Sequence, residues 1–275
     1  MPNEKQQVFW NSEGGDFWAS EADRLDQFLE PVIPSILDPI KELPISHVLD
    51  IGCGPGALSL AAAKHFSNVT GIDLSNKLIS MAWERTLSAG LPAQFVAGDA
   101  ATFEPAFPFE ALVSRFGVMF FDQPIEAFAA LRARSTPGAR LSVATWAPIE
   151  ANPWIMETLE VVRPLLVEPF EALDPEAPGP FSMAHPNRVE RLLSGAGWKN
   201  ITINHWQNNL GMPEQTPEGA AAFFSGISPA CRRAINQGTD PMELYVRLLE
   251  FYRAKLEKEG QINVQGAALL IQATA

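Results

Sequence analysis

The aspartates and alternating glycines of this chain have a spacing that could bind a ligand. Gly52, Gly54 and Gly56 come directly after a short apolar run that Asp50 interrupts. Glycine permits positive φ and lets a ligand approach the bare backbone. We expect a helix from Ala57 onward, so the amides of the loop and the N-terminus of that helix face one spot. This turn therefore predicts a cradle for a nucleotide-type ligand.

Two further aspartates follow the next two apolar runs. Asp73 ends the second run, and a carboxylate about 20 residues beyond such glycines can accept hydrogen bonds from ribose hydroxyls. Asp99 follows the third run, where a carboxylate can accept from the amino group of adenine while the amide of Ala100 donates to the ring. Considered alone, Asp99 fits the cap of a turn better. The order of the three acids favours a ligand site.

The glycines alone leave the identity of the nucleotide open. Gly52, Gly54 and Ala57 fit the dinucleotide fingerprint, which tolerates alanine at its third position. Gly52, Gly54 and Gly56 instead resemble the first motif of class I methyltransferases that use S-adenosylmethionine (SAM). A tight turn without any ligand is the third interpretation. On the glycines alone, the methyltransferase interpretation is favoured.

Composition argues against several classes of protein. The chain has 275 residues and a formal net charge of -12, whereas nucleic-acid binding needs clustered Lys and Arg. The two cysteines provide no disulfide framework, and no carboxylate cluster typical of a metal site is evident. No apolar run reaches the roughly 20 residues of a membrane span, and residues 1–7 lack a signal-peptide core. We expect a cytoplasmic monomer or homodimer without a metal, acting on a small molecule rather than on nucleic acid or membrane.

Five apolar runs must position these side chains. They cover residues 48–51, 69–73, 94–96, 111–114 and 140–145, and helical patterns separate them. Strands that alternate with helices predict an α/β fold with a parallel, Rossmann-like, doubly wound sheet. Ligands bind beyond the carboxyl ends of such strands, where all three aspartates are expected.

Large aromatic side chains crowd the N-terminus. Phe9, Trp10 and Trp18 precede a helical stripe that starts near Leu25. A polar tail does not carry several large aromatics unless some of them are buried. Residues 1–43 are therefore either a helical segment packed on the sheet or a lid whose aromatics close over the ligand, and we favour the lid.

Residues 44–148 resemble the core of a class I SAM-dependent methyltransferase, of the subgroup related to the methyltransferases of ubiquinone and menaquinone biosynthesis. Four motifs in the expected order carry this resemblance, and Phe9-Trp10-Asn11 matches the opening of the subgroup. The motifs are Val48-Leu49-Asp50-Ile51-Gly52-Cys53-Gly54-Pro55-Gly56, Gly71-Ile72-Asp73-Leu74-Ser75, Gly98-Asp99-Ala100 and Ser114-Arg115-Phe116-Gly117-Val118-Met119-Phe120-Phe121.

The resemblance implies roles at the methionine end of the cofactor. Asp50 and the backbone from Gly52 to Gly56 would hold the amino and carboxylate groups. Ser114 would present its carbonyl to the amino group, with Arg115 close by. Aromatic faces near a sulfonium cation would favour it. The candidates for such faces are Phe9, Trp10, Trp18 and Trp146.

At the adenosine end the resemblance implies that Asp73 binds the ribose and that Leu74 lies against the adenine. Asp99 and Ala100 would read the adenine edge. The methyl donor is then SAM, and S-adenosylhomocysteine is the product. The implied activity is methylation of an oxygen or carbon of an apolar or aromatic metabolite. The alternative is a SAM-binding regulatory or partner subunit that transfers no methyl group.

The rest of the chain is expected to complete the sheet and to cover it. Residues 188–211 predict a core helix and an edge strand, and residues 261–275 predict the last strand. In this superfamily these two strands form an antiparallel hairpin, which gives a seven-stranded sheet. Residues 149–187 and 212–260 predict a mostly helical cap over the catalytic face. We expect most aromatics in this cap to form its own core, and any that line the pocket would indicate an apolar or aromatic acceptor.

Histidines are the natural candidates for a general base near neutral pH. His185 lies in the cap segment just before a proline, where relatives tend to carry an aspartate as a helix cap. His205 lies in the expected edge strand, and His47 and His65 are interpreted as structural. His185 and His205 are therefore the candidate catalytic residues. An enzyme without a dedicated base is at least as well supported, since proximity alone can suffice.

Overall fold

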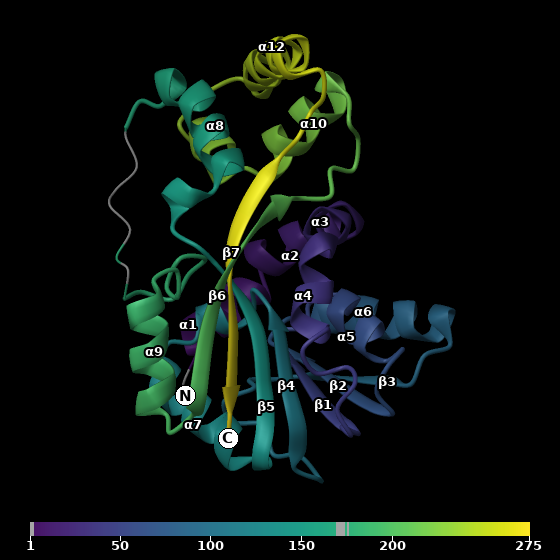
Figure 1. Cartoon of the computed structure of the whole chain (residues 1–275). Helices are drawn as coiled ribbons and strands as arrows, with labels where there is room; N and C mark the ends of the chain where they lie inside the picture. Colours follow the sequence, from purple (N-terminus) through teal and green to yellow (C-terminus); the bar gives the residue numbers. More distant parts are fainter. Residues whose placement is uncertain (1–2, 169–173, 175) are drawn as a thin grey trace.

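The computed structural model describes residues 3–168, 174 and 176–275. Its centre is a seven-stranded sheet of order β3-β2-β1-β4-β5-β7-β6. Strands β1 to β5 are parallel, and β7 runs antiparallel to both β5 and β6 (Figure 1). The bounds are β1 His47–Ile51, β2 Asn68–Asp73, β3 Ala93–Ala97, β4 Phe109–Arg115, β5 Ser135–Trp146, β6 Lys199–Asn209 and β7 Gln265–Thr274. The predicted doubly wound sheet and its antiparallel C-terminal strands are confirmed.

Helices cover both faces of the sheet. The helices α4 (Ile33–Leu37), α5 (Ala57–Ala62) and α6 (Asn76–Ala89) pack on one face, and α7 (Pro124–Ala133) and α9 (Pro186–Gly195) pack on the other (Figure 1). This arrangement buries both sides of the central strands, which explains why they read as nearly continuous apolar runs. The side chains of β1 after its first residue are at most 2% exposed.

Local sequence signals set the connections next to the pocket. Ser75 caps α6, because its hydroxyl oxygen accepts a hydrogen bond from the amide of Leu78 at 3.4 Å. The same helix ends at Gly90, which has a φ of 63°. Gly56 begins α5 with a φ of 90°, and a Cβ there would lie 3.1 Å from the Phe95 ring and 3.2 Å from Ala82. The glycine therefore lets this turn pack tightly against α6 and β3.

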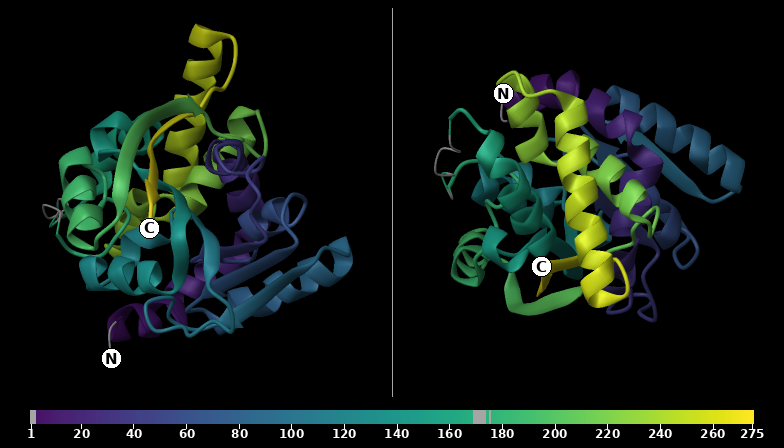
Figure 2. Two further views of the ribbon diagram at one scale, coloured as in Figure 1. Left: turned by 60° about the horizontal axis from the view of Figure 1, so that its bottom comes forward. Right: turned by 90° about the horizontal axis from the view of Figure 1, so that it is seen from above.

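Short helices at the N-terminus lie beside the carboxyl ends of the strands. They are α1 (Glu4–Trp10), α2 (Glu13–Ser20) and α3 (Ala22–Leu29), followed by a 3-10 turn at Glu30–Val32 that leads into α4. Figure 2 shows this part of the chain next to the cap helices when the molecule is seen from above. The predicted stripe near Leu25 is correct, since Leu25, Phe28 and Leu29 are buried. The interpretation of residues 1–43 as a lid stays a prediction.

A group of helices stands above the sheet, beyond the carboxyl ends of the parallel strands (Figure 1). The described members are α8 (Pro153–Val162), α10 (Pro217–Ile227), α11 (Pro229–Asn236) and α12 (Pro241–Glu259), and shorter 3-10 turns lie at Ile149–Ala151 and Arg163–Leu165. Phe28 of α3 joins this group, with ring-centroid distances of 5.5 Å to Trp154 and 5.0 Å to Phe223. Part of the predicted cap segment 149–187 lies outside the described residues.

Candidate active site

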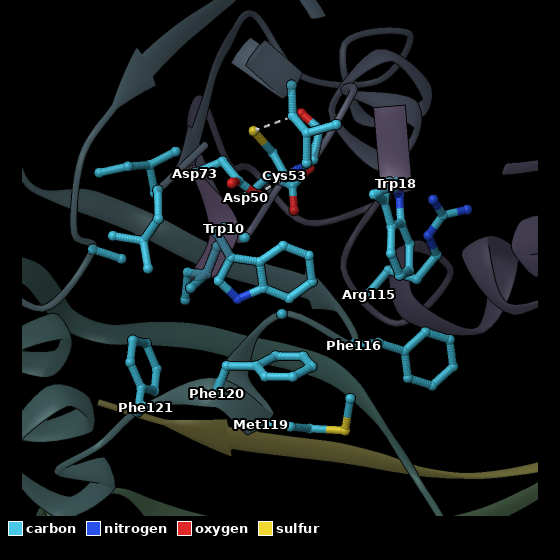
Figure 3. A pocket seen from close by; sticks show the side chains of 18 of the residues that line it. Trp10, Trp18, Asp50, Cys53, Asp73, Arg115, Phe116, Met119, Phe120 and Phe121 are labelled. Carbon is cyan, nitrogen blue, oxygen red and sulfur yellow. Dashed lines mark hydrogen bonds between the residues drawn. The ribbon is translucent and has the colours of Figure 1, made fainter. Parts of the chain in front are cut away.

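A pocket lies at the carboxyl ends of β1 to β4, under the N-terminal helices. In Figure 3 Asp50, Cys53 and Asp73 lie on one side of it and Met119, Phe120 and Phe121 on the other, with the Trp10 ring between them. The residues that line it include ten that the sequence singled out as cofactor-binding: Trp10, Trp18, Asp50, Gly52, Gly54, Asp73, Leu74, Asp99, Ala100 and Arg115. Parts of the chain from residue 10 to residue 115 thus meet in one cavity.

The glycine loop is held against its neighbours through its backbone. Gly52 has a φ of 65°, and a Cβ there would lie 2.7 Å from the Cα of Gly117. The amide of Gly54 donates a 2.8 Å hydrogen bond to one carboxylate oxygen of Asp73, and the amide of Ser75 donates at 2.8 Å to the other. Asp73 therefore fixes the loop and still keeps a lone pair on each oxygen for a ligand. Burial raises the pKa of its carboxyl, and these backbone hydrogen bonds oppose the rise.

Asp50 is 1% exposed and only partly satisfied. One carboxylate oxygen accepts a 2.6 Å hydrogen bond from the hydroxyl of Ser59. The other oxygen is buried and has no hydrogen-bond partner within the described part of the chain. Burial raises the pKa of the carboxyl to about 7, although Ser59 and the charge of Arg115 both oppose the rise. A cationic hydrogen-bond donor at the free oxygen would complete this group.

Arg115 has an unpaired hydrogen-bond donor, whereas Asp50 has an unpaired acceptor. Its Nη2 donates to a carboxylate oxygen of Asp26 on α3, whereas its Nη1 is buried and has no hydrogen-bond partner among the described residues. The side chain is 7% exposed. The guanidinium lies beside Trp18 in Figure 3. An anionic acceptor would satisfy the free nitrogen, so the pocket presents one unpaired acceptor and one unpaired donor of opposite charge.

Asp99 already has partners from this chain. The side-chain amide of Asn3 donates to both of its carboxylate oxygens, at 3.0 and 2.9 Å, and the amide of Ala101 donates to one of them at 2.9 Å. Asn3 lines the same pocket and is 4% exposed. The sequence did not single out this residue, because no local pattern ties it to a carboxylate 96 positions away.

Three predicted cofactor residues do not line the pocket. Gly56 packs against α6 and β3, as described above. Ser114 is fully buried and its hydroxyl donates a 2.6 Å hydrogen bond to the carbonyl of Ile51, so its side chain joins β4 to β1. Phe9 is 43% exposed, and its ring lies at an angle to that of Trp10 with the centroids 5.3 Å apart. None of these three residues lines the pocket, and the predicted role of the Ser114 carbonyl stays a prediction.

Neither candidate base is part of the pocket. His185 is exposed at the N-cap position of α9, where its side chain makes no capping hydrogen bond. His205 is exposed on the edge strand β6, paired with Leu269. Neither lines the pocket that the aspartates line, so the structure does not bring them together with the site. Among the described residues that line the pocket there is no histidine.

Aromatic side chains that the sequence did not assign complete the pocket. The Phe116 ring stacks on Trp146 with centroids 4.1 Å apart and planes 10° apart. Phe116 has a φ of 66°, a conformation that favours glycine, and it directs the chain from β4 toward the glycine loop. Phe120 meets Trp10 edge to face at 5.2 Å. The motif from Ser114 to Phe121 thus supplies aromatic side chains to the pocket as well as Arg115.

The strand order, the acids at the strand ends and the glycine loop define the class I methyltransferase architecture, in which SAM is the methyl donor. Residues 48–138 match the model of a family described as a methyltransferase domain. Over these residues the chain is similar to methyltransferase domains. The predicted assignment to that class is confirmed.

Curated relatives agree with this assignment over the same part of the chain. A ubiquinone biosynthesis O-methyltransferase of Xylella fastidiosa is 35% identical over 123 residues, which cover 42% of this chain and 50% of that protein. An uncharacterized methyltransferase of Mycobacterium tuberculosis is 31% identical over 113 residues, 41% of this chain and 56% of that protein. The chain thus spans about half the length of the curated relatives it matches.

Solved structures share the fold over most of the chain. The magnesium protoporphyrin IX methyltransferase of Synechocystis, solved with bound S-adenosylhomocysteine, is 14% identical with a TM-score of 0.55, covering 98% of this chain and 99% of that one. A methyltransferase structure from Bacillus halodurans is 18% identical with a TM-score of 0.53, covering 86% and 96%. Within the described residues, no helix is long and apolar enough to span a bilayer.

Proposed function

We propose that this chain transfers the methyl group of SAM to an oxygen or carbon atom of an apolar or aromatic small molecule. The observation that carries the proposal is the pair of unsatisfied charged atoms in the pocket, Asp50 Oδ1 and Arg115 Nη1. A buried charge without a partner is costly, so such a pair indicates a ligand that brings both complements. The ammonium and carboxylate groups of an amino acid meet this requirement, and a dinucleotide has no such pair.

The acids at the next two strands fit the remainder of the donor. Asp73 can accept hydrogen bonds from two ribose hydroxyls through the lone pairs that Gly54 and Ser75 leave free. Leu74 and Ala100 line the pocket between Asp73 and Asp99 and give the adenine an apolar surface and a backbone amide. Together with Asp50, these residues form a continuous path for an adenosine joined to an amino acid.

The aromatic side of the pocket suits an apolar acceptor. Phe116, Met119, Phe120, Phe121 and Trp146 line the cavity opposite the aspartates. Their surfaces offer burial and stacking to a flat ring rather than ion pairs to a charged group. The formal net charge of -12 also opposes a polyanionic acceptor. We therefore propose phenols, quinones and related metabolites as the acceptor class.

The residues of this chain act mainly by positioning. Bound SAM supplies a methyl group on a sulfonium cation, which is an electrophile that needs no further activation. Trp10, Trp18 and Trp146 surround the space and can stabilise a cation through their ring faces. Holding the acceptor about 3 Å from the methyl carbon contributes several kcal/mol of rate acceleration. We propose no histidine base, and an acceptor that is already ionised requires none.

Incubation of the purified full-length chain with SAM and a panel of phenols, quinones and polyketides tests this function. Release of S-adenosylhomocysteine is the measurement, and we expect it with at least one aromatic acceptor. The matched control is Asp50→Asn, which keeps the size of the side chain but removes the charge. Tight binding of SAM without turnover on any acceptor would support a regulatory subunit instead. Absence of SAM binding would refute both.

A further inference from the structure

Asn3 links the N-terminus to the two walls of the adenine end of the pocket. Its side-chain amide nitrogen donates to Asp99 Oδ1 at 3.0 Å and to Asp99 Oδ2 at 2.9 Å. Its side-chain oxygen accepts a 2.7 Å hydrogen bond from the backbone amide of Asp122. The residue is 4% exposed, so this contact is buried and both ends of the carboxamide are satisfied. The site therefore has an internal ligand at Asp99.

The carboxamide of Asn3 has the same hydrogen-bonding pattern as the edge of adenine. An asparagine side chain presents an N–H donor next to an oxygen acceptor. Adenine presents its amino donor next to a ring-nitrogen acceptor in the same order. Asp99 is the carboxylate expected to accept from the adenine amino group, and Asn3 already donates to both of its oxygens. Because the amide nitrogen of Asn3 lies within 3.0 Å of both oxygens, it takes the position from which the adenine amino group would donate to this carboxylate.

Further contacts hold α1 across the entrance. The side-chain amide of Asn11, at the C-terminal end of α1, donates to the carbonyl of Leu74 at 2.7 Å and its oxygen accepts from the amide of Asn76 at 3.1 Å. Trp10, the last residue of α1, lines the pocket and lies against Phe120 (Figure 3). The helix is thus fastened at the Asp99 end by Asn3 and at the β2 end by Asn11.

We propose that Asn3 occupies the adenine-reading position of Asp99 in the ligand-free chain and must leave it before the adenine moiety binds. This contact is a built-in competitor that sets the rate and affinity of cofactor binding. The proposal rests on the proposed function, since it takes the ligand to be SAM or S-adenosylhomocysteine. Opening requires only that Asn3 withdraws from Asp99 and Asp122, because the Asn11 contacts involve other groups.

The test is the binding of S-adenosylhomocysteine to the full-length chain, followed by calorimetry and by stopped-flow tryptophan fluorescence. Asn3→Ala removes the competitor. We expect about tenfold tighter binding, which corresponds to one charge-assisted hydrogen bond, and a faster association rate. Asn3→Asp places a like charge beside Asp99 and should act in the same direction. The matched control is Asn11→Ala, which loosens α1 but leaves Asp99 occupied, so its affinity should stay within about twofold of the wild type.

Three results would overturn the proposal, and they differ from one another. Weaker binding by both Asn3 variants would mean that the side chain holds the cofactor rather than competing with it. Equal tightening by Asn11→Ala would mean that the whole helix restricts access, without a specific role for Asn3. If the wild-type chain binds no S-adenosylhomocysteine, the proposed function fails, and this inference fails with it.

Discussion

Asp26 and Arg115 form an ion pair that joins the N-terminal helix α3 to the end of β4. The same carboxylate accepts a hydrogen bond from Arg85 of α6 at 2.6 Å, and Arg85 also donates to the carbonyl of Pro55 in the glycine loop at 3.1 Å. Asp26 thereby holds the guanidinium of Arg115 by one nitrogen, and the other nitrogen has no hydrogen-bond partner among the described residues. A residue outside the pocket thus positions a residue inside it.

Replacement of Asp26 by asparagine should weaken S-adenosylhomocysteine about tenfold, because Arg115 loses its charged partner. Binding of 5′-methylthioadenosine, which has no amino acid part, should change by less than about twofold. Asp23→Asn is the control. Asp23 lies on α3 like Asp26 and also pairs with Arg85 of α6, but its side chain is 94% exposed. Calorimetry with both ligands separates a loss specific to the amino acid part of the cofactor from a general loss of binding. An equal loss for the two ligands would indicate general damage to the N-terminal helices instead.

Cofactor binding should weaken as the pH falls below about 7, because the ammonium group needs Asp50 ionised and burial raises the pKa of that carboxyl to about 7. Binding should therefore release a proton near pH 6, which calorimetry detects as a dependence on the ionisation enthalpy of the buffer. In the ligand-free protein the raised pKa has the converse effect: the contribution of Asp50 to the free energy of unfolding falls as the pH rises from 3.8 to about 7. Asp50→Asn should remove this part of the pH dependence. Wild-type affinity that is constant between about pH 5.5 and 8 would contradict the assignment.

The stacked pair of Phe116 and Trp146 should affect the acceptor more than the cofactor. Trp146→Leu is expected to lower kcat/KM for an aromatic acceptor by about 2- to 10-fold, because that is the contribution of one aromatic pair. The affinity for S-adenosylhomocysteine should stay nearly unchanged. Trp83→Leu is the control, because Trp83 is 40% exposed on α6 and does not line the pocket. Steady-state kinetics with the best acceptor of the panel measure the difference. A loss of affinity for SAM, with the affinity for S-adenosylhomocysteine and kcat unchanged, would place the sulfonium, rather than the acceptor, at this stack.

Phe28 should contribute strongly to stability, because it is 1% exposed and joins α3 to Trp154, Phe223 and Phe224. Phe28→Ala is expected to reduce the free energy of unfolding by about 3–5 kcal/mol through lost burial and a cavity. Phe107→Ala is the control, since Phe107 is 68% exposed, and its effect should stay within about 0.5 kcal/mol. Denaturant titration provides both values. Equal effects would show that the contacts of Phe28 add no stability.

The sequence could predict the parts of the site that lie next to one another along the chain. Asp50 lies within an apolar run, Asp73 ends the next one and Asp99 follows the third, and the carboxyl ends of parallel strands meet at one edge. Ser75 and Gly90 likewise predict the two ends of α6, because they are typical N-cap and C-cap residues. These features depend on a few neighbouring residues, so a linear pattern contains them.

The remainder depends on contacts between distant residues. Asn3 meets Asp99 across 96 positions, and Asp26 meets Arg115 across 89. No periodicity encodes such pairs, and the helices α1 and α2 are too short to show a clear apolar stripe. His185 has the chemistry of a general base and departs from a family pattern, but the fold places it on the surface. Chemical aptitude does not determine which side chains share a cavity.

Calorimetric titration of the wild-type chain and of Asp73→Ala with S-adenosylhomocysteine tests the central claim most directly. The wild-type chain should bind, and Asp73→Ala should bind about 100-fold more weakly, because two charge-assisted hydrogen bonds to the ribose are lost together with the support of the glycine loop. A circular dichroism melt of the variant establishes that it remains folded. Unchanged affinity in Asp73→Ala, or binding of a nicotinamide dinucleotide in place of S-adenosylhomocysteine, would contradict the account.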